Sequence, residues 1–344
     1  MSVTSLRAPT AAACLLVAAC ELPELPIVEQ RWIVPVEETV VDVDELLPNG
    51  VVVDPTGAAF DVSVPQVSAS ETLGDLCGPP CIVASGLMIP VPVPPFSATF
   101  SSSEALPPDV LSATIAGAQV DIEIVNGFSF DPLAGGGTLE IVVTDEGGGG
   151  TVGQLALDGA SEALAPGSTT TRSVTLTSGV VISGPLAATA SLDVVGGQVA
   201  TIDAADVLGV SVTTDPLGVS SITVAVAGRA VDIESTDLEA DELDAWFTDA
   251  IMSGTILLDI SNPFGAGVDG DIDIGGVTKT FSITDAPTST VDLTYTGDEL
   301  RSFLGLPGVA LTGSGTVVGG PVTISPGIEM RIGATLDVVV RFGS

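Results

Sequence analysis

Apolar and polar residues alternate along much of the chain, and this alternation predicts β-strands. Residues 59–64 read Ala-Phe-Asp-Val-Ser-Val, so that apolar side chains recur at every second position. Such side chains lie on one face of a strand, which makes this segment typical of a half-buried strand. Residues 31–36 and 39–43 also read as strands. The four prolines between residues 90 and 95 limit that stretch to a sheet edge or a linker.

A helical spacing occurs once over a longer segment, in the last third of the chain. The apolar positions that share one helix face are Leu243, Trp246, Phe247, Ala250 and Ile251. Thr236 and Glu239 have the spacing of a capping box at the start of this segment. We therefore expect an amphipathic helix at about 237–251, with its aromatic side chains packed in the core. A second, shorter helix is expected at 298–304, ending at Gly305.

Two parts of the chain resemble each other. Residues 115–128 read IAGAQVDIEIVNGF and residues 251–264 read IMSGTILLDISNPF, so both strands end in Asn, one residue and Phe. A Thr-rich strand follows each, at 172–177 and at 290–295. Val-Val-Gly-Gly then occurs at 194–197 and at 317–320. This order predicts two copies of one β module with loops of different length.

The second copy resembles a known family, the LEA-type, water-stress (WHy-like) β-sandwich. The resemblance rests on a strand ending in Asn262-Pro263-Phe264 and on a later strand, 291–295, that leads into the helix at 298–304. It covers about residues 250–342 and, more loosely, 115–215, where Gly127 replaces the proline. The whole chain also resembles bacterial lipoproteins that begin with Arg-Trp-x-Val-Pro after a tether. Neither resemblance implies an enzyme.

Together these patterns predict an all-β protein of tandem antiparallel β-sandwich modules. We expect a signal peptide at 1–19 and a tether at 20–30. A β-rich region at 31–114 follows, then module 1 at 115–234 and the helix with module 2 at 235–344. The 40 glycines and 24 prolines among 344 residues agree with strands and turns.

The formal net charge of −36 narrows the choice of partners. Such a field repels phosphate groups, so nucleic acid is excluded as an expected partner, and bare anionic membranes are disfavoured. Cationic partners and divalent ions are allowed. The simplest interpretation is a soluble, acidic surface.

The N-terminus predicts export and lipid anchoring. Arg7 precedes a short apolar run that ends in Val17-Ala18-Ala19-Cys20. A basic start, a short apolar segment and small residues before the cut define a signal peptide. Small residues before a cysteine resemble the bacterial lipobox, which implies acylation of Cys20, with chains such as palmitate, and attachment to the cell envelope. Glu21 is compatible with sorting to the outer membrane in that family.

Cys77 and Cys81 are the two cysteines left after removal of the signal peptide and acylation of Cys20. In an exported protein, a pair separated by three residues is expected to form a structural disulfide. Free thiols and a redox-active pair are the alternatives, and the spacing is not that of a redox Cys-x-x-Cys.

No residue is predicted to be catalytic, and we expect neither enzymatic activity nor a cofactor. Histidine is absent, which removes His-based triads and His-ligated zinc. Lys279 is the only lysine. Asp269, Asp271 and Asp273 alternate along one predicted strand, so their carboxylates share a face and form a weak candidate Ca²⁺ site. A solvated outer face explains them equally simply.

Two classes of function remain from the sequence. The first is a membrane-anchored envelope lipoprotein that acts as a non-catalytic structural or interaction module. The second is a carrier of apolar ligands such as lipid, in which the aliphatic modules enclose a cavity. An enclosed apolar cavity of about 300 Å³ or more favours the carrier.

Overall fold

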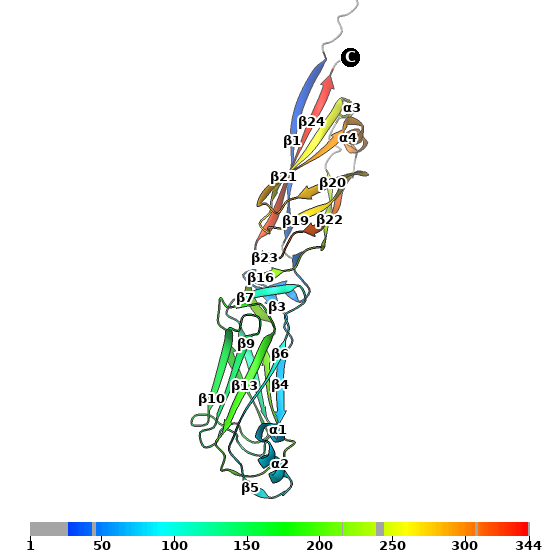
Figure 1. The fold of residues 1–344 in the computed structure, drawn as a ribbon. Helices are drawn as coiled ribbons and strands as arrows, with labels where there is room; N and C mark the ends of the chain where they lie inside the picture. The colour runs from blue at the N-terminus through cyan, green and yellow to red at the C-terminus, as the bar shows by residue number, and fades with distance from the viewer. Residues whose placement is uncertain (1–26, 43–45, 215, 239–243, 307–308, 343–344) are drawn as a thin grey trace, which may run out of the picture.

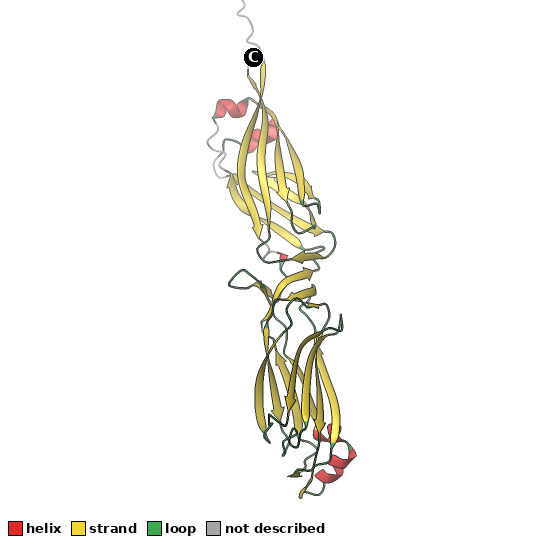
Figure 2. Cartoon of the chain, turned by 90° about the vertical axis from the view of Figure 1, so that its left-hand side faces the viewer, coloured by secondary structure: helices red, strands yellow, loops and turns green. Residues whose placement is uncertain are grey.

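The structure, a computed structural model, describes residues 27–42, 46–214, 216–238, 244–306 and 309–342. It is mostly β, with antiparallel sheets and four short helices in this part of the chain, which confirms the all-β fold class. The molecule is elongated, and two β-sandwiches lie end to end along its length (Figures 1 and 2). No helix among the described residues is long and apolar enough to cross a bilayer.

The sandwich farther from the chain ends, here called the inserted sandwich, contains two four-stranded sheets. Their strand orders are β10-β9-β13-β6 and β11-β8-β15-β4. The strand bounds are β4 Val67–Thr72, β6 Phe96–Glu104, β8 Gln119–Asn126, β9 Thr138–Asp145, β10 Thr151–Asp158, β11 Ser168–Thr175, β13 Leu186–Val194 and β15 Val207–Thr213. Burial alternates along β8 and β9, and their inward residues are apolar until each strand ends.

The second sandwich contains both ends of the described chain and is here called the terminal sandwich. Its sheets have the orders β1-β24-β18-β21 and β17-β22-β19-β20. The strand bounds are β1 Val28–Asp42, β17 Ala230–Leu238, β18 Ile251–Ser261, β19 Gly267–Ile274, β20 Val277–Ile283, β21 Thr288–Thr296, β22 Val309–Val318 and β24 Glu329–Phe342.

A smaller sheet lies between the two sandwiches and is here called the neck sheet. Its order is β12-β7-β16-β3-β2, and β23 pairs with β16. The bounds are β2 Val51–Val53, β3 Phe60–Val62, β7 Val110–Ile115, β12 Val181–Ile182, β16 Leu217–Val224 and β23 Val322–Ile324. Because β23 comes from the terminal segment and β7 from the inserted one, this sheet joins the two sandwiches through backbone hydrogen bonds.

The two sandwiches have the same topology. One sheet of each sandwich has the same strand order when β4 is matched to β1, β8 to β18, β11 to β21 and β15 to β24. The other sheet of each sandwich has the same strand order when β6 is matched to β17, β9 to β19, β10 to β20 and β13 to β22. The repeated sequence segments of β8 and β18 fall on equivalent strands, in agreement with two copies of one module.

The shared Asn-x-Phe motif has the same geometry in both copies. Asn126 and Asn262 are buried at the ends of β8 and β18. Each side-chain amide donates to loop carbonyls, and each Oδ1 accepts from the backbone N–H two residues later, at Phe128 or Phe264. The asparagine therefore ties the strand end to the loops around it.

The residue between Asn and Phe differs for a local reason. The Gly127 N–H donates to the Val207 carbonyl at 2.9 Å. A Cβ on Gly127 would lie 2.6 Å from that same oxygen. Proline, present at 263 in the second copy, supplies no N–H and adds a ring, so position 127 requires glycine.

The sheets divide the chain differently from the sequence-based boundaries at 114/115 and 234/235. Strand β1, expected in an N-terminal β-rich region, pairs along its length with β24, from Val28↔Phe342 to Asp42↔Glu329. Strands β4 and β6 belong to the inserted sandwich. Residues 31–114 therefore form no separate domain. The pairing of β1 joins strands at opposite ends of the chain, and local alternation carries no information about such partners.

The prediction of a helix at about 237–251 is wrong. Residues 237 and 238 end β17, residues 239–243 lie outside the described part, and α3 spans only Ala245–Asp249. Strand β18 begins at Ile251. Phe247 is 9% exposed, whereas Trp246 is 61% exposed and does not pack in the core. The shorter helix expected at 298–304 agrees with α4, which spans Gly297–Phe303.

Candidate functional site

The predicted lipidation site, Cys20, lies outside the described residues, but the structure shows where the chain leading to it enters the fold. Val28 pairs with Phe342, so both ends of the described chain meet at one end of the molecule (Figure 1). The seven-residue step from Cys20 to Ile27 spans at most about 25 Å when extended. Acyl chains on Cys20 would therefore hold the molecule by this end, here called the anchor end.

Aromatic rings and ion pairs fasten the anchor end. Phe247 lies 5.4 Å from the Trp32 ring and 6.0 Å from the Trp246 ring, and Trp246 lies 5.7 Å from Phe342. Arg31 on β1 binds the buried carboxylate of Asp337 on β24 through two nitrogens. The hydrogen bond and charge of Arg31 hold the pKa of Asp337 below its usual value. These contacts attach the first strand to the last.

Helices α1 and α2 and a two-stranded sheet form the opposite end, here called the tip. Helix α1 spans Leu73–Cys77 and α2 spans Pro79–Ser85. Strand β5, Pro90–Pro92, pairs with β14, Val199–Thr201. Cys77 and Cys81, the pair for which the sequence predicts a bond, are joined by a disulfide with 5.7 Å between their Cα atoms. The bond links the two tip helices across Gly78.

The tip exposes large aliphatic side chains that the sequence analysis did not single out. Their exposed fractions lie between 53% and 85% for Ile82, Val83, Leu87, Met88, Ile89 and Val199. A sequence signal for this surface is an absence of charge, because residues 76–103 and 194–202 contain no Asp, Glu, Lys or Arg. In a chain with 44 acidic and 8 basic residues, these are notable gaps.

The candidate Ca²⁺ residues Asp269, Asp271 and Asp273 lie on β19. No group of three or more potential metal-binding side chains occurs among the described residues, so these aspartates do not converge on a metal site. Asp269 accepts from the Ser282 hydroxyl, and Asp273 accepts from Gly276 N–H and the Thr278 hydroxyl. Both carboxylates thus serve the β19–β20 hairpin.

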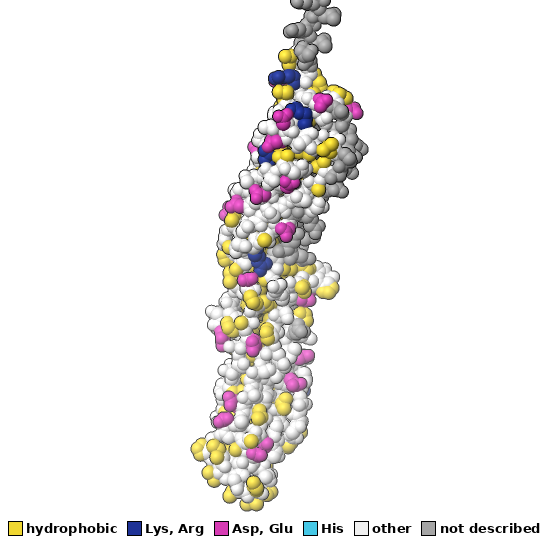
Figure 3. All heavy atoms as spheres, turned by 90° about the vertical axis from the view of Figure 1, so that its right-hand side faces the viewer, with side chains coloured by type: hydrophobic (Ala, Val, Ile, Leu, Met, Phe, Trp, Pro, Cys, Tyr) yellow, Lys and Arg dark blue, Asp and Glu magenta, His cyan; other side chains and the backbone are white. Residues whose placement is uncertain are grey.

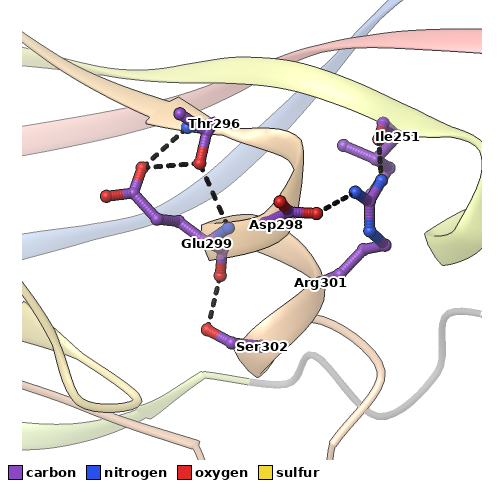
Figure 4. A network of polar contacts seen from close by, with 6 residues as sticks. All are labelled: Ile251, Thr296, Asp298, Glu299, Arg301 and Ser302. Carbon is purple, nitrogen blue, oxygen red and sulfur yellow. Dashed lines mark hydrogen bonds and ion pairs between the residues drawn. The ribbon is translucent and has the colours of Figure 1, made fainter.

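A polar network fixes α4 against the terminal sandwich (Figure 4). Thr296 and Glu299 form a capping box: Glu299 N–H donates to the Thr296 hydroxyl, and Glu299 Oε2 accepts from Thr296 N–H at 2.7 Å. Arg301 donates to the Ile251 carbonyl and pairs with Asp298. The network therefore connects the helix to the start of β18.

Lys279 extends this network on the other side. Its Nζ lies 2.8 Å from Glu299 Oε1 and 5.0 Å from the centre of the Tyr295 ring. The hydrogen bond from Lys279, followed by those from Thr296, lowers the pKa of Glu299 to about 2. Burial, with the nearby charges of Glu299 and Asp273, raises the pKa of Tyr295 to about 12. These two pKa values keep Glu299 ionised and Tyr295 neutral at neutral pH.

Two hollows on the surface of the described residues are candidate ligand sites. One, of about 380 Å³, lies beside α4 and is lined by Asp273, Ser302, Phe303 and neighbouring residues. The other, of about 320 Å³, lies over β6, β9 and β13 and is lined by serine, threonine and acidic side chains. Both are open to solvent and have mixed or polar linings, so neither is the enclosed apolar cavity that a lipid carrier needs.

Comparison with known proteins gives no family. No family model and no curated protein match the sequence. Among solved structures, a protein of Parabacteroides distasonis ATCC 8503 that is thought to be secreted has 12% identity and a TM-score of 0.35, over 90% of this chain and 99% of that chain. The broad bean stain virus structure has 11% identity and a TM-score of 0.20, over 67% of this chain and 78% of that chain. At these TM-scores the likenesses carry no argument about function.

Proposed function

We propose that the protein is a lipid-anchored envelope protein whose two stacked sandwiches act as a non-catalytic structural or interaction module. The observation that carries the proposal is the position of β1: the chain leading from Cys20 enters at one end of an elongated molecule (Figure 1). An acyl anchor there places the tip at the end of the molecule opposite the attachment point (Figure 1). We propose the outer membrane as the place of attachment. The resemblance to the LEA-type family stays a prediction.

The molecule suits a rigid spacer. The neck sheet runs continuously between the sandwiches, with Ile222↔Ile324 and Val224↔Val322 pairing on one side of β16 and β7 on the other. Arg229 adds a contact across the neck, because it donates to the Leu46 carbonyl and pairs with Asp109. Stacked modules joined by backbone hydrogen bonds transmit position better than modules on a flexible linker.

Lipid anchoring is tested at Cys20 itself. The intact mass of the protein extracted from membranes should equal the chain from residue 20 plus acyl chains. The Cys20→Ala variant should lose these chains and leave the membrane fraction. A membrane protein that begins at another residue, or a wild-type protein found only in the soluble fraction, would contradict the proposal.

The carrier alternative has its own test. Native mass spectrometry of the chain from residue 21 onward, purified from cells, should show no retained lipid if the sandwiches are packed solid. A stoichiometric lipid that survives extraction would favour the carrier. Capture of partners in the native envelope, with Cys20→Ala as the control, then separates a structural role from an interaction role.

A further inference from the structure

The tip carries a group of large apolar side chains that are exposed to solvent. Ile82 and Val83 lie on α2, Leu87, Met88 and Ile89 follow it directly, and Val199 lies on the paired strand β14. Hydrophobic atoms gather at this rounded end of the molecule in Figure 3. Contiguous apolar surface of this kind marks a contact with another apolar surface rather than with water.

The backbone holds these side chains outward. The Cys77–Cys81 disulfide joins α1 to α2, and Gly74 N–H donates to the Ala204 carbonyl at 2.9 Å. Ala204 N–H in turn donates to the Ser85 hydroxyl at the end of α2. Met88 has a φ of 51°, a left-handed conformation that costs energy for a residue with a long side chain. The most exposed residue of the group is therefore held in place by the fold rather than by its own preference.

Charge separates the tip from the rest of the molecule. No charged residue occurs in 76–103 or 194–202, whereas Asp75, Asp203 and Asp206 lie at the border of this surface. An uncharged surface enters a low-dielectric medium without a desolvation cost for ions. The acidic border repels anionic surfaces and so selects a neutral or zwitterionic one.

The chemistry of the tip favours lipid over protein. Protein interfaces concentrate Trp, Tyr and Arg in pockets and add a rim of hydrogen bonds. The exposed tip side chains named above are five branched aliphatic side chains and one methionine, without Trp, Tyr or Arg, and neither surface hollow lies among them. The end is convex in Figure 3, so two copies meeting there would bury little area, whereas a bilayer deforms around it.

We propose that the tip inserts its aliphatic side chains into a zwitterionic lipid bilayer. This contact is independent of the Cys20 anchor, which belongs to the opposite end of the molecule. If both hold, the protein has a lipid contact at each end of the molecule.

The test uses the chain from residue 21 onward, which keeps every described residue and lacks the acylated cysteine. Flotation with phosphatidylcholine vesicles should carry the protein upward, and adding phosphatidylglycerol at low salt should weaken binding. Ile82→Asn with Met88→Asn should reduce partitioning about tenfold or more. Asparagine tolerates the left-handed backbone at position 88, so this variant should keep its fold.

A matched control distinguishes the tip from exposed apolar residues elsewhere. Val52→Asn with Val181→Asn changes two comparably exposed residues of the neck sheet and should leave vesicle binding unchanged. Absence of vesicle binding, or equal binding by the tip variant, would overturn the inference. Tip-dependent dimerisation in sedimentation without vesicle binding would also overturn it, in favour of a second copy. None of these results bears on acylation, because Cys20 is missing throughout.

Discussion

Two buried asparagines, Asn126 and Asn262, connect strand ends to the loops around them. Asn126 donates to three loop carbonyls, of Phe130, Leu164 and Ala165, and accepts from the Phe128 N–H. Asn262 repeats the pattern at the equivalent strand end. In each copy one side chain satisfies backbone groups that water cannot reach, and their loss would leave those groups buried and unpaired.

We expect Asn126→Ala to lower the free energy of unfolding by about 2–4 kcal/mol, because buried groups lose their partners. Urea unfolding followed by circular dichroism measures this. The exposed Asn49, changed to alanine, serves as the control and should have a much smaller effect. A value for Asn126→Ala equal to that of the control would show that the network is not stabilising.

The lowered pKa of Glu299 predicts that the stability of the protein depends on pH. Its pKa is lowered from 4.5 to about 2 in the folded protein, chiefly by the hydrogen bond from Lys279. A lowered folded-state pKa means that the contribution is fully present above pH 4.5 and is lost as the pH falls toward 2. Glu299→Gln should therefore lose less stability than the wild type over this acid range.

The measurement is the urea midpoint of both proteins at a series of acidic pH values. Comparing the two curves is necessary because Asp54, Asp145 and Asp337 also have lowered pKa values and add their own acid sensitivity. The matched control is Asp298→Asn, which neutralises the neighbouring carboxylate on α4 without removing the partner of Lys279. Parallel curves for wild type and Glu299→Gln would contradict the assigned role of Lys279.

At the scale of elements, the two sandwiches differ mainly in what interrupts the same strand order. Between β4 and β6, the inserted sandwich has α1, α2 and β5. Between the equivalent strands β1 and β17, the terminal sandwich has the whole inserted sandwich and most of the neck sheet. The pairing of β5 with β14 likewise corresponds to that of β16 with β23. The tip thus occupies the place where one module carries the next.

The disulfide between the two tip helices leads to a local prediction. Cys77→Ser with Cys81→Ser should lower the stability of the tip by about 2 kcal/mol, the value expected for a loop of this length. Hydrogen exchange should rise in α1 and α2 and stay unchanged in β18 and β24, which are remote from the tip. Equal exchange throughout, with and without the bond, would show that the tip is ordered by packing alone.

The molecule as a whole depends on a contact between its first and last strands. Among the described strands, β1 lies at the edge of its sheet and pairs with β24, whereas both sheets of the inserted sandwich consist of strands within residues 67–213. The Arg31–Asp337 ion pair adds to this closure, and removing β1 would leave Asp337 without this cation.

Deleting residues 28–42 should therefore destabilise the terminal sandwich selectively. We expect hydrogen exchange to increase in β24 and β18, while β8 and β13 of the inserted sandwich keep their protection. The full chain is the reference, and Arg31→Ala should give a weaker effect of the same kind. Retained protection of β24 after the deletion would show that β1 is dispensable.

Much of the fold follows from local sequence. Alternation predicts the strands, the Asn-x-Phe motif and the Val-Val-Gly-Gly pairs mark equivalent positions in the two copies, and the acidic start of α4 marks its first turn. The capping-box spacing of Thr236 and Glu239 led to a wrong helix prediction. Strand pairing with β22 extends β17 to Leu238 and overrides the helical preference there. Hydrogen bonds to a distant strand leave no trace in a local pattern.

The sequence by itself determined the strand content, the duplication, the disulfide pair as a candidate and the predicted lipidation signal at Cys20, because each depends on residues close together in the chain. Only the tertiary structure decided that β1 completes the terminal sandwich, that the inserted sandwich lies between β1 and β17, and that the uncharged segments 76–103 and 194–202 meet at one end. Those results depend on which distant strands pair, and that choice is made by the packing of the whole chain.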